Sequence, residues 1–224
     1  MPATTRLLDD NIVSQVKEVF ADLKEPVKVI FFGDDGQCQY CDDTRQLLEE
    51  VTAISDKLSL DVYDLSANAD AAEQYNVDKA PGIVIAADNG DEIMDYGVRY
   101  AGIPSGHEFS SLITDLVRVS QRDSGLSDAT RQFLATLTEP VNMMVFVTPT
   151  CPYCPRAVIL AHQFAMESPM VQAEMVEAME FPKLSDQYGV SGVPHTTINY
   201  GKGTVVGAVP EAHMLQELKN ALGR

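Results

Sequence analysis

The chain has 224 residues and a formal net charge of −17, with 33 acidic residues against 16 basic ones. This balance excludes a protein that binds nucleic acid or an anionic membrane surface through a basic patch. The length and a hydrophobic content of 45% predict two domains of about 110 residues, each with its own core. The sequence has no apolar run long enough to span a membrane and begins without the apolar core of a secretory signal.

The first half begins with apolar residues at helical spacing, from Ile12 to Leu23, and this expected helix ends near Pro26. Residues 27–32 are apolar and β-branched and predict a buried strand, which leads through a Gly- and Asp-rich loop to Cys38. Asp88-Asn89-Gly90 predicts a hairpin turn, because Asn and Gly tolerate a positive φ. The other elements expected in this half are a helix over 47–58, strands over 60–65, 83–85 and 92–96, and a helix over 112–117.

The second half repeats this order of elements. We expect a helix over 133–137, strands over 141–147, 170–179, 196–200 and 204–206, and helices over 154–167 and 214–222. The polar segment from Ser120 to Gly125 is the expected boundary, and it is short enough for the two units to pack as a rigid pair. The predicted domains are therefore residues 1–120 and residues 121–224.

Sequence motifs repeat between the two halves. Cys38-Gln39-Tyr40-Cys41 recurs as Cys151-Pro152-Tyr153-Cys154, and these are the only four cysteines. Pro81 and Pro194 follow their pairs at the same distance, and Leu23–Val27 matches Leu137–Val141. The distance between matching residues falls from 114 to 113 just before Cys38, which gives the first half one extra residue there. It falls to 106 near the ends of the halves, which places about seven more first-half residues around Gly97 to Ile103. Several matching motifs in the same order indicate that one unit has been duplicated.

The CxxC spacing points to thiol chemistry. Each pair lies where a predicted strand leads into a predicted helix, and a helix N-terminus favours the thiolate that attacks a disulfide. We therefore expect Cys38 and Cys151 to be nucleophiles, and Cys41 and Cys154, one turn deeper, to be resolving thiols. Cysteines confined to CxxC pairs are typical of a reducing compartment, so a cytoplasmic location is predicted.

The four cysteines are also compatible with a structural or a sensing role. Two CxxC pairs can hold zinc, which would make the chain a metal-bridged structural protein, although zinc ribbons place their pairs much closer together. A redox-switched chaperone or sensor that binds its partner without turnover is a further alternative. Edge strands of the predicted sheets leave a homodimer open.

Each half resembles thioredoxin and glutaredoxin, in which a CxxC opens a helix and a proline precedes a hairpin. The whole chain resembles the two-unit protein disulfide oxidoreductases, or glutaredoxin-like proteins, of thermophilic archaea and bacteria; CQYC followed by CPYC is a mark of that family. The resemblance implies an α/β fold of two tandem thioredoxin-like domains. In each domain, a mixed four-stranded sheet is flanked by helices.

The resemblance also implies a function and a site. It implies a thiol–disulfide oxidoreductase that reduces, forms or isomerises protein and peptide disulfides, with the second unit the more active. It implies no metal and no cofactor beyond the redox-active disulfides Cys38–Cys41 and Cys151–Cys154, and a thioredoxin-reductase-like flavoprotein as electron donor. The residues expected to contact substrate are Ala80 and Val193 through their main chains, the cis prolines Pro81 and Pro194, and Tyr40 and Tyr153 within the motifs.

Thioredoxins carry a buried acid on the first strand, and the matching positions here are apolar, as in Phe31 and Phe32. The usual acid is therefore expected to be absent. Asp64 and Glu177 occupy equivalent places at the ends of the second strands, where we favour a solvated strand end over proton handling. His195, which follows Pro194, is a candidate for tuning the Cys151 thiolate.

Overall fold

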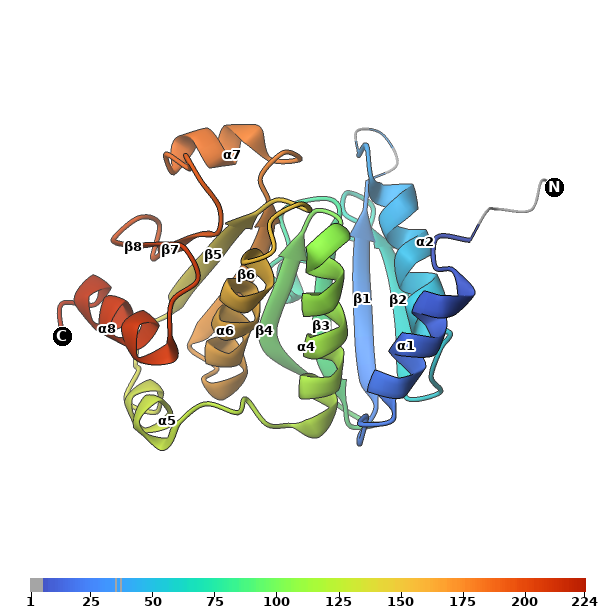
Figure 1. Cartoon of the computed structure of the whole chain (residues 1–224), viewed down its shortest axis with the longest axis horizontal. Coiled ribbons are helices and arrows are strands. Elements are labelled where there is room, and N and C mark those ends of the chain that lie inside the picture. The colour runs from blue at the N-terminus through green and yellow to red at the C-terminus, as the bar shows by residue number, and fades with distance from the viewer. Residues whose placement is uncertain (1–5, 35, 37) are drawn as a thin grey trace.

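The structure, a computed structural model, describes residues 6–34, 36 and 38–224. Its centre is a single eight-stranded sheet with the strand order β2-β1-β3-β4-β6-β5-β7-β8, covered by helices on both faces (Figure 1). The expected α/β fold with two tandem thioredoxin-like units is confirmed. The union of the two four-stranded sheets into one sheet was not predicted.

The first unit contains four strands, four α-helices and one short 3-10 helix among the described residues. Its elements are α1 (Asp10–Phe20), β1 (Val27–Gly33), α2 (Cys41–Thr52), β2 (Leu58–Asp64), α3 (Ala69–Gln74), β3 (Gly82–Asp88), β4 (Ile93–Ala101), η1 (Gly106–Glu108) and α4 (Phe109–Gln121). The sequence did not predict α3, because six residues with one buried alanine carry no clear apolar period.

The second unit repeats this series. Its elements are α5 (Asp128–Leu134), β5 (Val141–Val147), α6 (Cys154–Glu167), β6 (Val171–Glu177), α7 (Pro182–Gln187), β7 (His195–Ile198), β8 (Gly203–Val206) and α8 (Glu211–Ala221). The short helix α7 was missed for the same reason as α3. Residues 122–127 lie between α4 and α5, close to the expected boundary, and the division at residue 120 stays a prediction.

Local sequence explains where several helices begin. Asp9 caps α1 by accepting a hydrogen bond from the backbone of Ile12, and Ser127 caps α5 in the same way from Thr130. The strand β1 is a run of β-branched and aromatic residues, all but one of them buried, as expected for a strand covered on both faces. Within the described residues, every helix is too short or too polar to cross a membrane.

The two units have the same strand pairing. In each, the first strand pairs in parallel with the second and antiparallel with the third, and the third pairs antiparallel with the fourth. The units join through β4 and β6, which run parallel and place Val98 opposite Ala173 and Ala101 opposite Val176. Backbone hydrogen bonding across this junction makes the pair rigid, as the short linker suggested.

The additional first-half residues lie in the hairpin between β3 and β4. Residues 86–97 connect Ile85 to Val98, whereas residues 199–202 make the equivalent connection from Ile198 to Gly203. The prediction that the extra residues lie around Gly97 to Ile103 was therefore wrong by several positions. Residues 98–101 are the paired end of β4, where the repeat is kept and where the second unit attaches.

The main core is shared by both units on one face of the sheet. Figure 1 shows α2, α4 and α6 on this face, with α4 next to α6, and the buried apolar residues of the three helices belong to one continuous cluster that also contains Cys41, Cys151 and Cys154. Smaller clusters lie on the opposite face, one beneath α3 and one beneath α7. Because α4 of the first unit packs against α6 of the second, the second CxxC helix is held by both units.

Candidate active site

The two CxxC pairs follow the carboxyl ends of β1 and β5, at the same end of the continuous sheet. Helix α2 begins at Cys41 and α6 begins at Cys154. Cys38 and Cys151 therefore lie in the turns just before the helices, at the join of strand and helix that the sequence predicted. Pro152 is also outside the helix, and Pro155 takes the early helical position at which a missing N–H does no harm.

Both pairs are closed as disulfides, with Cα atoms 5.5 Å apart for Cys38–Cys41 and 5.6 Å apart for Cys151–Cys154. Within each pair the first cysteine is the more exposed. Cys38 is half-buried, whereas Cys41 is only 8% exposed. Cys151 is 8% exposed, whereas Cys154 is 0% exposed. An incoming substrate can therefore reach the first sulfur of each pair more readily than the second.

The proline loops lie where the sequence predicted. The Ala80–Pro81 and Val193–Pro194 peptide bonds are both cis, as expected. The carbonyl oxygen of Val193 lies 3.7 Å from Cys151 Sγ, so this loop borders the second pair directly. In the described part of the chain, the peptide N–H and C=O of Ala80 make no hydrogen bond and remain free for a partner strand.

The motif tyrosines differ in exposure. Tyr153 is 64% exposed and Tyr40 is 36% exposed, and each is the residue immediately before its helix. A cavity of about 400 Å³ lies beside the first pair and is lined by Cys38, Cys41, Arg45 and Tyr63 among others. The first pair is thus the more open of the two.

A buried acid lies beside the second CxxC helix, and the sequence did not predict it. Glu108 is 1% exposed and belongs to η1, which packs against α6. The backbone N–H of the preceding residue, His107, donates to the carbonyl of Pro149 at 2.9 Å, two residues before Cys151. Gly106, which precedes His107, lies so close to Pro149 that an added Cβ would be 2.3 Å from the Pro149 carbonyl oxygen.

Burial raises the pKa of Glu108 to about 7, while the hydrogen bond from Ser111 and the charge of His162 oppose this rise. The carboxylate Oε1 has no partner among the described residues. The sequence does hold a signal for it, since Glu108, Ser111 and Asp115 recur at helical spacing on the apolar face of α4. The first strand, where thioredoxins carry their acid, has buried Phe31 and Phe32 instead.

The two second-strand acids have different surroundings. Asp64 is half-buried and accepts hydrogen bonds from the backbone of Ser66 and Ala67, so it caps a turn. Glu177 is 3% exposed, which contradicts the solvated strand end that we favoured. Burial raises the pKa of Glu177, and it raises the pKa of nearby Glu180 to about 7 with a contribution from the Glu177 charge.

Two of the three histidines of the second unit, His162 and His195, lie inside the protein. His195 pairs with Phe146 across the sheet and stacks edge-on against its ring, on the face opposite Cys151 and α6. Burial lowers the pKa of His195. The structure gives no contact through which His195 would tune Cys151 among the described residues. His162 is fully buried on α6, within 2.6 Å of Asp115.

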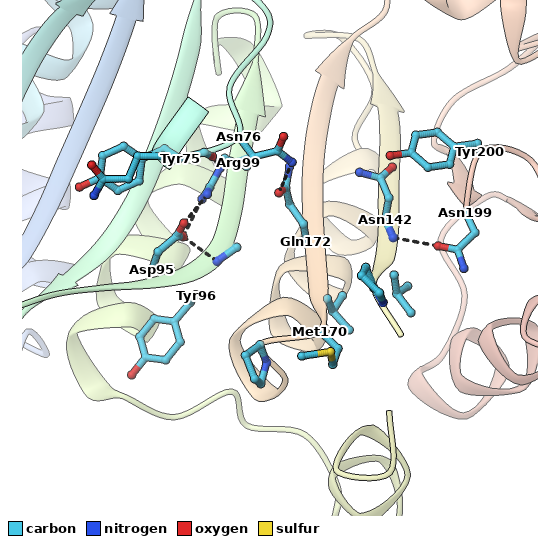
Figure 2. A pocket seen from close by; sticks show the side chains of 16 residues that line it. Tyr75, Asn76, Asp95, Tyr96, Arg99, Asn142, Met170, Gln172, Asn199 and Tyr200 are labelled. Atoms are coloured by element: carbon cyan, nitrogen blue, oxygen red, sulfur yellow. Dashed lines mark hydrogen bonds and ion pairs between the residues drawn. The ribbon is translucent and has the colours of Figure 1, made fainter. Parts of the chain in front are cut away.

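A separate polar cavity of about 360 Å³ lies at the other end of the strands, where β5 and β6 begin (Figure 2). An Asn76–Gln172 hydrogen bond of 2.8 Å crosses it between the units, and the Asp95–Arg99 ion pair closes one side. Within residues 6–34, 36 and 38–224, no group of three or more His, Cys, Asp or Glu side chains is arranged to hold a metal ion.

Comparisons with known proteins agree with this geometry. Residues 141–220 match a family model described as a thioredoxin domain. The protein disulfide oxidoreductase from Aeropyrum pernix is 33% identical, with a TM-score of 0.87 over 99% of this chain and 98% of that one. The NTD_N/C domain of alkylhydroperoxide reductase AhpF from Enterococcus faecalis is 25% identical, with a TM-score of 0.85 over 94% of this chain and 99% of that one.

Among curated relatives, the F subunit of alkyl hydroperoxide reductase from Pseudomonas aeruginosa is 24% identical over 203 residues, which are 88% of this chain and 35% of that protein. The chain thus spans about a third of the length of the curated relatives it matches. The match to the Aeropyrum protein, in contrast, runs through both units from end to end. With its two repeated units and a CxxC disulfide in each, the chain belongs to the thioredoxin-fold family of protein disulfide oxidoreductases.

Proposed function

We propose that the protein exchanges disulfides with protein and peptide substrates through its two dithiols, with Cys151 and Cys154 as the principal pair. The observation that carries this proposal is the paired exposure of the cysteines, an accessible sulfur followed by a buried one at a helix start. An accessible thiolate suits attack on a substrate, and a buried neighbour suits release of the product. No bound cofactor is needed, because the disulfides themselves carry the electrons.

The reductive reaction has two steps. The Cys151 thiolate attacks one sulfur of the substrate disulfide, which forms a mixed disulfide and releases the other substrate sulfur as a thiolate. Cys154 then loses its proton and attacks Cys151 Sγ, which releases the second substrate thiolate and closes the Cys151–Cys154 disulfide. Two electrons have passed from the protein to the substrate. The reverse sequence forms a disulfide, and the two directions together isomerise one.

Glu108 is the proposed proton acceptor in the second step. Cys154 has no exposed surface, so its proton has no direct route to water. The carboxyl of Glu108 lies in the helical turn that packs against α6, has a free buried oxygen, and has a pKa of about 7. A base with a pKa near the working pH can both accept and return a proton.

The proposed substrate strip is the pair of cis-proline loops. An extended substrate segment can pair with the free peptide groups of Ala80, and the Val193 loop offers an equivalent edge beside Cys151. Pro81 and Pro194 fix these loops, and Tyr40 and Tyr153 provide aromatic surface for contact. Backbone pairing selects for extended chains and hardly for sequence, which suits a general disulfide catalyst.

The pair Cys38–Cys41 is proposed as a second dithiol, acting on its own or passing electrons to the other pair. A thioredoxin-reductase-like flavoprotein is the proposed electron donor. The likeness to the F subunit of alkyl hydroperoxide reductase supports a donor of this kind. It also makes the disulfide of a peroxide-reducing protein a substrate worth testing.

Dithiothreitol-dependent reduction of insulin tests the proposal. We expect the Cys151→Ser protein to lose nearly all activity and the Cys38→Ser protein to keep most of it. A wild-type protein with no activity above the dithiothreitol background would reject the catalytic proposal. Binding of an unfolded client by a protein with all four cysteines replaced would then support the chaperone or sensor alternative.

A further inference from the structure

Four polar side chains are buried together where the two units meet, and we call them the junction cluster. They are Tyr100 of β4, Glu108 of η1, Asp115 of α4 and His162 of α6, and each is 1% exposed or less. The first three come from the first unit, and His162 comes from the helix that begins at Cys154. Buried polar groups are costly unless they are paired, so such a cluster is a built feature.

Asp115 is the centre of the cluster. Its Oδ2 accepts a hydrogen bond from the Tyr100 hydroxyl and lies 2.6 Å from His162 Nδ1. His162 Nε2 lies 3.0 Å from the carbonyl oxygen of Arg99, which can only accept, so Nε2 carries a proton. The ring of His162 is thus held through both of its nitrogens, between the backbone of Arg99 and the carboxyl of Asp115.

Glu108 is the member of the cluster without a charged partner of its own. The Ser111 hydroxyl bonds one carboxylate oxygen, and Oε1 has no partner in the described part of the chain. The titratable groups facing it are Tyr100 on β4, Asp115 on the helix that follows it and His162 on α6. The charge of His162 favours the ionised carboxylate, whereas burial and the charge of Asp115 oppose it.

The internal repeat shows that the fold does not require this cluster. From the alignment of His107 with His213 and the register of the last two strands, the counterparts are Met214 for Glu108, Ala221 for Asp115, Val205 for Tyr100 and Glu49 for His162. Met214 and Val205 are apolar core residues, and the Glu49 side chain is 55% exposed on α2. The polar set thus occurs only beside the second CxxC helix.

We propose that the His162–Asp115 pair, held by Tyr100, sets the pH at which Glu108 takes the proton of Cys154. The inference rests on the proposed function and deepens it. In the step concerned, the sulfur of Cys154 bonds to Cys151 Sγ, the Cys151–substrate S–S bond breaks, its electron pair leaves with the substrate thiolate, and the proton moves to Glu108. Tyr100, Asp115 and His162 touch none of these atoms, so they are positioning residues.

The resolving step can be timed in a full-length chain carrying Cys38→Ser and Cys41→Ser. The reduced protein is mixed with dithiobis(nitrobenzoate), an aromatic disulfide whose thiolate absorbs visible light. Attack by Cys151 releases one thiolate, and attack by Cys154 then releases a second in a separate phase. The rate of the second phase, followed between about pH 5 and about pH 9, gives the midpoint at which Cys154 resolves.

In this background we expect His162→Gln to raise that midpoint by about one pH unit, because the carboxylate loses a nearby positive charge. Below the midpoint, the second phase should slow by about tenfold. Tyr100→Phe keeps the packed ring and removes only the hydroxyl, so it should shift the midpoint in the same direction by less. Glu108→Gln should remove the inflection altogether.

Two controls separate electrostatic from structural effects. Glu49→Gln changes the repeat counterpart of His162 and should leave the midpoint unchanged. Each substitution is also introduced into a second chain that keeps Cys38 and Cys41 and carries Cys151→Ser and Cys154→Ser, so that the reactivity of the first pair reports an intact fold. If the His162→Gln protein folds poorly, the midpoint of the Tyr100→Phe protein is the deciding measurement.

The proposal is overturned if folded His162→Gln and Tyr100→Phe proteins keep the parent midpoint, or if Glu108→Gln keeps the inflection. If the parent protein shows a normal first phase in that case, the proposed exchange reaction is still supported. Absence of the first phase in the parent would instead overturn the exchange reaction, and the role of the junction cluster with it.

Discussion

The first CxxC site is made by one unit, whereas the second is made by two. Around Cys38 and Cys41 the structure leaves a cavity of about 400 Å³, and the site residues come from the first unit. Around the second site, the α4 and η1 segments of the first unit pack against α6, and Cys154 at the start of α6 is fully buried. The same motif on the same fold therefore lies in two different environments.

This difference follows from chain order. The segment after β4 passes from the first site to the second: Gly102 N–H bonds the carbonyl of Pro81, and His107 N–H bonds the carbonyl of Pro149. In this chain order only the second unit receives such a segment, which brings the buried acid Glu108 with it. Duplication here produced two sites that can diverge in chemistry.

The largest expected difference between the sites concerns their resolving thiols. Cys154→Ser should lower turnover of a protein disulfide by at least about 100-fold and trap a mixed disulfide on Cys151, because no second thiol releases it. Cys41→Ser should cost a few-fold at most. Mass spectrometry of the protein after incubation with substrate detects the adduct. Equal accumulation of adducts on Cys38 in the Cys41→Ser protein would make the two sites equivalent and break the comparison.

Gly106 tests how strongly the first unit supports the second site. Its φ is +59°, and an added Cβ would meet the Pro149 carbonyl oxygen at 2.3 Å. Gly106→Ala should therefore lower the free energy of unfolding by about 3 kcal/mol and slow exchange at Cys151 more than at Cys38. Urea unfolding and single-site thiol kinetics measure both effects.

The matched control for that substitution is Gly189→Ala. Gly189 has a similar φ of +63°, and an added Cβ there would meet nothing within 4 Å. It carries the backbone strain without the collision, so it should cost only about 1 kcal/mol. If the two variants lose equal stability, the contact between Gly106 and Pro149 does not support the second site.

Glu108 should make the free energy of unfolding depend on pH, by an amount similar to the loss expected for Gly106→Ala. Its pKa is raised from 4.5 to about 7 in the folded protein, so the native state holds this proton more tightly than the unfolded chain. The resulting stability is fully present below about pH 4.5 and is lost as the pH rises to about 7, a change of about 3 kcal/mol. Glu108→Gln removes this contribution and should flatten the profile.

Urea unfolding of the oxidised protein at about pH 4.5 and about pH 8 measures that slope. Burial also raises the pKa of Glu177 and of Glu180, so the informative quantity is the difference between wild type and variant. Parallel profiles for the two proteins would show that Glu108 keeps an ordinary pKa, and the second site would lose its distinguishing acid.

Much of this arrangement could be predicted from the chain. Hydrophobic period and turn residues placed the strands and most long helices within a few residues, and β5 was predicted with its observed bounds. The helix predicted over 47–58 was wrong by six residues at each end, since α2 ends at Thr52 and Leu58 already begins β2. The cysteine spacing and the repeated prolines located both pairs and both proline loops, and the resemblance to thioredoxin implied the two cis peptide bonds. These features are local, and each depends on residues close together in sequence.

The features that were missed depend on contacts between the units. The pairing of β4 with β6 leaves no mark on either strand beyond continuous burial, so the single sheet was not foreseen. Glu108 and His162 have ordinary neighbours in sequence, and only packing of α4 on α6 makes them one buried cluster. Glu177 looked like an exposed strand end because the sequence does not show that Gly102 of the first unit lies against its side chain.

The smallest expected difference lies at the motif tyrosines. Tyr153→Ala should raise the KM for an unfolded disulfide substrate several-fold with little change in kcat, since its ring is 64% exposed beside Cys151 and can contact a bound chain. Tyr40→Ala should have less effect, because Tyr40 is only 36% exposed and stands beside the pair that we propose to be the less active. Stability should change by no more than about 0.5 kcal/mol in either variant. A fall in kcat for Tyr153→Ala without a change in KM would mean that the ring shields the sulfur from water, and that substrate contact at the second site depends on the Val193 loop alone.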